Sequence, residues 1–174
     1  MDADAALRKN WHAMLFGIRR SIRYHQRRRA FYDRLDQISN ALSLILGSAA
    51  IYGVLDKDAH AVAIAASMLV TVISAVNLIL ASSQRARGHF DLARRFSDLE
   101  RQMLGAPVES TLLAAHAERL VIESDEPPKL SVLDCICHNE LMRAEGYKTE
   151  DLAKITWWQR LFAPFVDIRE DLIH

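Results

Sequence analysis

Two long runs without a charged side chain constrain this sequence more than any other feature. The first run is residues 38–55, ISNALSLILGSAAIYGVL, and the second is residues 61–83, AVAIAASMLVTVISAVNLILASS. As helices they would be about 27 and 35 Å long, and the hydrocarbon core of a bilayer is about 30 Å thick. Each run can therefore cross a membrane as one helix.

The polar residues of the two runs are Ser, Thr, Asn and Tyr, which membrane helices tolerate. A surface helix of a soluble bundle needs a charged or strongly polar outer face, and neither run has one. We therefore predict a transmembrane hairpin with spans 38–55 and 61–83. The alternative is a soluble protein in which both helices are fully buried, which a chain of 174 residues can cover only with difficulty.

The distribution of charge predicts an orientation for this hairpin. Residues 1–37 hold nine Lys and Arg against four Asp and Glu, and residues 84–105 hold five Arg against three acidic residues, whereas the connecting tip carries one Lys. Positive residues favour the cytoplasmic side, so both termini should be cytoplasmic and the tip DKDAH (residues 56–60) should face outward. The basic residues that flank the spans are Arg27, Arg28, Arg29, Arg34, Arg85, Arg87, Arg94 and Arg95.

The rest of the chain also reads as helix, so the predicted fold class is all-α. Apolar residues recur at helical spacing at Met14, Ile18 and Ile22 before the first span, and at Leu92, Phe96, Leu99 and Met103 after the second. We predict an N-terminal cytosolic helix over 1–37, the hairpin over 38–83, and a cytosolic helical region with an aromatic tail over 84–174. Residues 84–104 should continue the second span, and further helices should follow GAP at 105–107 and lie around Leu133, Cys137 and Leu141.

The sequence does not indicate an enzyme, a metal or a cofactor. It has no H-E-x-x-H, G-x-S-x-G or glycine-rich phosphate loop. In CICH the thiols of Cys135 and Cys137 would point to different sides of a helix, and a second ligand pair is absent from the sequence, so we interpret them as structural thiols.

Two aromatic stretches each permit two interpretations. YHQRRRAFY (residues 24–32) has the composition of a nucleic-acid patch, but it adjoins a span, where Arg meets anionic headgroups. We favour membrane lipid over nucleic acid as its partner. In WWQRLFAPF (residues 157–165), Trp157 and Trp158 are either an interfacial anchor or a contact with a neighbouring subunit.

Small residues line one face of each span. The first face holds Ser39, Ser43, Gly47 and Ala50; the second holds Ala63, Ser67, Thr71 and Ser74. Such faces let membrane helices pack closely, so the two faces could simply meet inside the hairpin. The alternative is that Ser67, Thr71, Ser74 and Asn77 line a pore, which requires several copies of a two-helix hairpin.

The order of these motifs resembles the SLATT family, the two-transmembrane effector domains associated with SMODS nucleotidyltransferases and SLOG sensors. The resemblance is carried by YHQRRRAFYDRLDQISNAL, the two spans with a short acidic tip, SSQRARGHFDLARRFSDLERQM and ERLVIESDEPPKLSVLDCICHNELMRAEGY, across residues 11–147. It implies an effector of a bacterial conflict system that forms pores in the inner membrane when a separate sensor protein or signal ligand triggers it.

Three hypotheses follow for the function. The first is an oligomeric pore-forming effector in the bacterial plasma membrane. The second is a membrane scaffold that does not conduct ions, for instance a prophage exclusion protein. The third is a soluble all-helical interaction domain whose uncharged hairpin is buried, for instance in a dimer.

Overall fold

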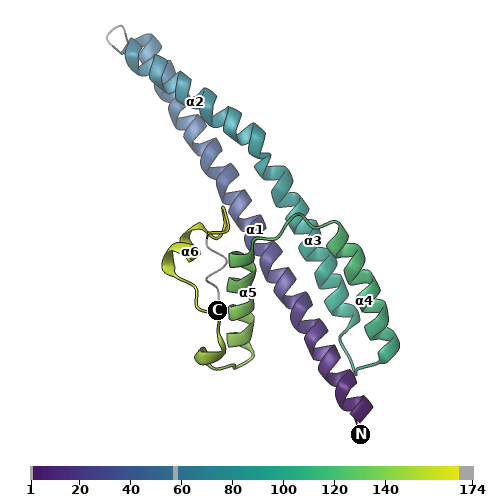
Figure 1. Ribbon diagram of the computed structural model, residues 1–174. Coiled ribbons are helices and arrows are strands. Elements are labelled where there is room, and N and C mark those ends of the chain that lie inside the picture. The colour runs from purple at the N-terminus through teal and green to yellow at the C-terminus, as the bar shows by residue number, and fades with distance from the viewer. Residues whose placement is uncertain (1, 57–58, 169–174) are drawn as a thin grey trace. The chain divides into compact units, whose positions relative to one another are not determined.

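A computed structural model describes residues 2–56 and 59–168, and every regular element in that part of the chain is a helix. The elements are α1 (Asp2–Leu55), α2 (His60–Leu80), α3 (Ser82–Gln102), α4 (Glu109–Ser124), α5 (Ser131–Ala144), the 3-10 helix η1 (Thr149–Asp151) and α6 (Trp157–Phe162) (Figure 1). The predicted all-α class is confirmed. Of the predicted hairpin tip, Lys57 and Asp58 lie outside the described residues.

The chain divides into two compact units. The first unit is Met1–Arg28 together with His89–His174, and the second is Arg29–Gly88. Helix α1 therefore contributes its N-terminal half to the first unit and its C-terminal half to the second. Each unit is described separately below.

The core of the first unit is formed by α1, α3 and α4. Both apolar stripes predicted from the sequence lie in it, because a helical period of 3.6 residues keeps them on one face of each helix. Ile18, Phe96 and Leu99 are among its most buried side chains. Full burial of one such side chain contributes about 1.5–3 kcal/mol. The members of this core are Trp11, Met14, Ile18, Ile22, Leu92, Phe96, Leu99, Met103, Leu112, Ala115 and Ile122.

A second, smaller core joins α5 and the residues after α6 to Tyr24 of α1. It consists of Tyr24, Val132, Leu133, Cys137 and Ala163. The N-terminus of α5 has no local side-chain cap. Instead the carboxylate of Asp167 accepts hydrogen bonds from the backbone N–H groups of Ser131 and Val132, at 2.8 and 3.0 Å. A negative charge is favourable at this end of a helix, so the segment after α6 is fixed against α5.

Helix α3 continues the second span, as predicted, after an interruption at one residue. Ala81 separates α2 from α3 in the left-handed conformation, with φ 47° and ψ 44°. Two backbone hydrogen bonds bridge this residue, because the Ala81 N–H donates to Asn77 O and the Arg85 N–H donates to Ala81 O, both at 3.0 Å. An alanine in this conformation costs backbone strain, and Ser82 directly after it is buried.

Candidate functional site: the apolar hairpin and the buried histidines

The second unit contains an apolar hairpin whose surface is mostly uncovered. Two helical stretches are long and apolar enough to cross a membrane, with 18-residue windows of mean hydropathy 1.7 and 2.3. Only 6% and 11% of those windows are buried within the chain. Helices in the core of a soluble protein would be mostly buried, so this hairpin needs lipid or further protein to cover it. Its most exposed large side chains include Leu44, Leu55, Leu78 and Ile79.

The two helices of the hairpin approach closely near its tip. A Cβ atom on Gly53 would lie 2.7 Å from Ala59 O, 2.8 Å from Ala63 N and 3.0 Å from the Ala63 Cβ. Gly53 and Ala63 are both buried, whereas most residues around them are exposed. Because Gly53 has no side chain, the backbones of α1 and α2 can approach closely at this point. Small residues allow the same close approach between membrane helices.

We expect Gly53→Ala to destabilise the hairpin by about 1–3 kcal/mol, because the added methyl group meets backbone atoms that cannot rotate away. Gly47→Ala is the matched control, since a Cβ there meets nothing within 4 Å. Thermal unfolding of the two variants in the same detergent measures the difference. Equal midpoints for both variants would contradict the close approach at Gly53.

The predicted row of small polar residues on α2 lies mostly on its open surface. Ser67, Thr71 and Ser74 are exposed, and of the second small-residue face only Ala63 is buried. The Ser67 hydroxyl donates to Ala63 O at 2.8 Å and the Thr71 hydroxyl donates to Ser67 O at 2.9 Å. These two hydroxyl protons are satisfied within the helix, so Ser67 and Thr71 can face lipid, another copy or water without an unpaired proton.

Asn77 differs from the other three candidates because it contacts α1. Its Nδ2 lies 3.5 Å from Asp36 Oδ1, and the same carboxylate accepts a hydrogen bond from Asn40 Nδ2 at 3.2 Å. These three residues, with Ser43, Ser74 and Ser82, line a crevice of about 350 Å³ at the α2–α3 end of the hairpin. The sequence analysis did not single out Asp36, although an acidic residue two positions before an uncharged run is the signal that identifies it.

The predicted basic flank is partly engaged by the protein itself. In the first unit Arg27 pairs with Glu140, Arg28 donates to Pro164 O at 2.6 Å, and Arg95 pairs with Asp125 at 2.5 Å. In the second unit Arg29 pairs with Asp33, and Arg85 donates to the Tyr32 hydroxyl at 3.4 Å while lying 5.8 Å from its ring. The exposed members that form no ion pair with another described residue are Arg34, Arg85, Arg87 and Arg94.

A chain of buried titratable groups crosses the first unit. His25 is fully buried, its Nδ1 lies 2.9 Å from His89 Nδ1, and its Nε2 lies 3.0 Å from Glu126 Oε1. The imidazole ring of His25 stacks on Phe96 at a centroid distance of 5.8 Å. The sequence analysis did not single out these histidines, because His25 and His89 are 64 positions apart and only the packing of α1 against α3 brings them together.

The charge of Glu126 fixes the direction of its hydrogen bond with His25. Burial alone would raise the pKa of Glu126, but hydrogen bonds from His25 and Lys129 outweigh it and hold the pKa below its ordinary value. As a carboxylate, Glu126 accepts the proton on His25 Nε2. Between the two histidines one Nδ1 donates to the other, so a single hydrogen-bonded chain links His89, His25 and Glu126.

The lowered pKa of Glu126 predicts how stability depends on pH. The ordinary value is 4.5 and the folded value is lower, so the carboxylate contributes its full stabilisation above pH 4.5. That contribution is lost as the pH falls below 4.5 through the folded value. Urea unfolding of the full chain in detergent between pH 7 and pH 3 measures it. We expect the free energy of unfolding of Glu126→Gln to fall less between pH 4.5 and pH 3 than that of Glu118→Gln, a change at an exposed site. An identical fall in both variants would contradict the prediction.

The surroundings of the two cysteines do not favour a reactive thiolate. Cys137 lies in the second core, and burial raises its pKa to about 12; Cys135 is half-buried and its pKa is raised for the same reason. Within residues 2–56 and 59–168, no group of three or more His, Cys, Asp or Glu side chains could hold a metal ion. Packing of Cys137 supports the interpretation of a structural thiol.

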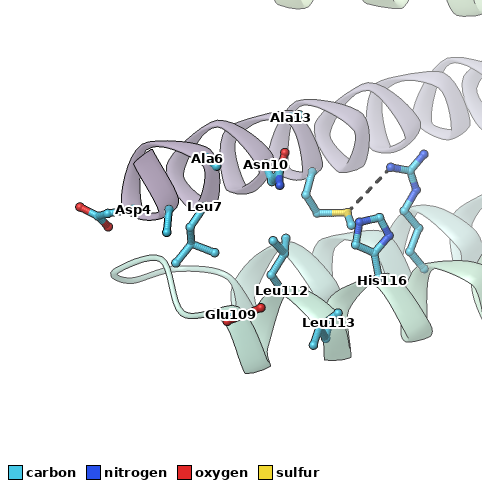
Figure 2. Close-up of a pocket in the computed structure, with 12 residues that line it drawn as sticks. Asp4, Ala6, Leu7, Asn10, Ala13, Glu109, Leu112, Leu113 and His116 are labelled. Carbon is cyan, nitrogen blue, oxygen red and sulfur yellow. Dashed lines mark hydrogen bonds between the residues drawn. The ribbon is translucent and has the colours of Figure 1, made fainter. Parts of the chain in front are cut away.

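An apolar groove of about 910 Å³ lies between the N-terminal part of α1 and α4. Figure 2 shows Leu7 of α1 and Leu112 of α4 pointing toward one another, while Asp4 points away from the groove. The Arg119 guanidinium donates to the sulfur of Met14 at 3.8 Å. This lining is typical of an incompletely filled helix contact, and it does not bring a nucleophile and a base together.

No family model, curated protein or solved structure matches this chain. The described geometry therefore defines a class only: an all-helical protein with an uncovered apolar hairpin.

Proposed function

We propose that this protein is a membrane effector whose hairpins assemble into an oligomeric pore in the bacterial plasma membrane. One observation carries the proposal: both apolar helices are long enough to span a bilayer, and the chain itself covers little of either. Two helices cannot enclose a channel, so conduction requires several copies. The exposed row of Ser67, Thr71 and Ser74 supplies a polar surface that such copies can turn toward a common axis.

The orientation and the biological role rest on the sequence. Basic residues flank both spans on the side of the termini, which favours cytoplasmic termini. Resemblance to the SLATT family supports a role in defence against phage, in which a separate sensor protein or signal ligand opens the pore or drives its assembly. The physical requirement is a free-energy difference between closed and open states that the signal can bias.

The test is membrane potential in living bacteria after induction, measured with a voltage-sensitive dye and combined with carbonate-washed membrane fractions of the same culture. The proposal predicts depolarisation and retention of the protein in the washed membranes. Protein in the soluble fraction would exclude the hairpin and favour a soluble helical interaction domain. Depolarisation that also occurs with a hairpin-deleted chain would exclude the hairpin as the conductor.

A second candidate is a membrane scaffold that does not conduct ions. The hydroxyls of Ser67 and Thr71 donate to carbonyls of their own helix, which also suits a face that only contacts lipid or packs. Replacing the hairpin with an unrelated two-span anchor separates the candidates. A scaffold keeps its biological activity in that chimera, whereas a pore loses it.

A further inference from the structure

A small pocket beside α6 is lined by cations and by no acidic side chain. It has a volume of about 320 Å³ and lies in the first unit, between the end of α5, the segment 152–156 and α6. Arg143 comes from α5, Lys154 from the connecting segment and Arg160 from α6. None of these three forms an ion pair with another residue among those the structure describes, so their charges are available to an anion.

Two hydrogen-bonded arrangements fix the frame of this pocket. Asn139 is buried, donates to Ala153 O at 2.7 Å and accepts from the Ala153 N–H at 3.1 Å, which ties the segment to α5. Thr156 and Gln159 form a capping box at the start of α6. The cations are therefore carried by a backbone that is already ordered, and binding an anion there costs little reorganisation.

The other exposed side of α6 is aromatic and apolar. Trp157 and Trp158 are 63% and 54% exposed and stack with ring centroids 3.6 Å apart, and Trp158 also stacks with Phe162. Leu161 and Phe165 extend this surface and are more than half exposed. Gln159 is the residue of α6 that turns inward. One short helix therefore presents tryptophans and a cation side by side.

We propose that the pocket of Arg143, Lys154 and Arg160 binds the phosphate of an anionic lipid headgroup while the tryptophans of α6 lie at the membrane interface. Charge complementarity selects this occupant over a protein surface: three uncompensated cations beside exposed Trp side chains match an anionic headgroup layer. The inference rests on the membrane location in the proposed function, but not on conduction.

The test uses the full chain in lipid nanodiscs with brominated acyl chains, which quench nearby tryptophan fluorescence. The chain has three tryptophans, and the third, Trp11, is in the core, so Trp11→Phe leaves only Trp157 and Trp158 as reporters. We expect stronger quenching in discs of brominated phosphatidylglycerol than in discs of brominated phosphatidylcholine. The double variant Lys154→Gln, Arg160→Gln loses two cations. In phosphatidylglycerol discs this loss should shift the equilibrium between α6 on the lipid surface and α6 away from it about thirty-fold toward the state away from lipid. The charge-matched control is Arg8→Gln with Lys9→Gln, two exposed residues near the start of α1, which should keep the preference.

Each other outcome overturns the inference. Absence of quenching in both lipids would place the tryptophans against protein, such as another copy. Equal quenching in both lipids would reduce the contact to apolar insertion without phosphate recognition. Relief of quenching by millimolar inorganic phosphate would make free phosphate the ligand. Protease protection of the hairpin and ion flux, measured on the same preparations, report the proposed function separately, so a silent pore with lipid-quenched tryptophans would contradict the pore alone.

Discussion

Replacing Ser67, Thr71 and Ser74 together with leucine is expected to abolish depolarisation, with a loss of at least about 90% of the wild-type signal, while membrane insertion is retained. A pore lined by these residues becomes a leucine constriction, and apolar constrictions exclude water and ions. Insertion should persist because the change makes α2 more apolar and leaves the buried contact between Gly53 and Ala63 intact. Voltage-sensitive dye fluorescence and washed membrane fractions measure the two properties.

The matched control is Ala65→Leu, Val72→Leu and Val76→Leu, three changes on a different exposed face of the same helix. These side chains should face lipid in the assembled pore, so the control variant should depolarise cells as the wild type does. Equal loss in both triple variants would indicate a general packing effect. Full depolarisation by the Ser67, Thr71 and Ser74 variant would exclude this row as the pore lining.

His25→Ala should have the largest effect on stability of any single change considered for the first unit. It removes the partner of a buried carboxylate and the hydrogen-bond partner of His89 Nδ1, and it opens a cavity against Phe96. Breaking a buried pair in this way costs about 3–5 kcal/mol. Urea unfolding of the full chain in detergent at pH 7 measures that cost as a lowered free energy of unfolding.

His12 provides the comparison on the same helix. Its side chain is 60% exposed and lies 3.3 Å from Glu145, so His12→Ala should change the free energy of unfolding by less than about 1 kcal/mol. A second variant, His25→Gln, keeps a donor that can reach Glu126 and should recover part of the loss. If His25→Ala is no more destabilising than His12→Ala, the hydrogen-bonded chain of buried side chains does not stabilise the fold.

The parts of the fold that periodicity encodes were predictable. Ile18 and Phe96 belong to stripes with the helical period, and both are fully buried. Leu133 and Cys137 marked α5 in the same way. The uncharged runs identified the two apolar helices of the hairpin because length and composition can be read from the sequence without any tertiary contact.

The parts that depend on tertiary contacts were not predictable from local patterns. The contact of His25 with His89 requires α1 and α3 to pack in one register, and the cap on α5 comes from Asp167, 36 positions away from Ser131. The break at Ala81 has no local signal, because alanine is the strongest helix former. Asn77 was one of the pore-lining candidates, but its contact with Asp36 of α1 depends on the packing of the two hairpin helices.

Single-channel recording of the purified full chain in planar bilayers tests the central claim most directly. We predict discrete conductance steps for the wild type and for the Ala65, Val72 and Val76 control, and a silent bilayer for the Ser67, Thr71 and Ser74 leucine variant. The contradicting result is a wild-type protein that never conducts, with or without the extract of phage-infected cells, although protease protection shows that it is inserted and cross-linking shows that it is oligomeric. That result would favour a scaffold.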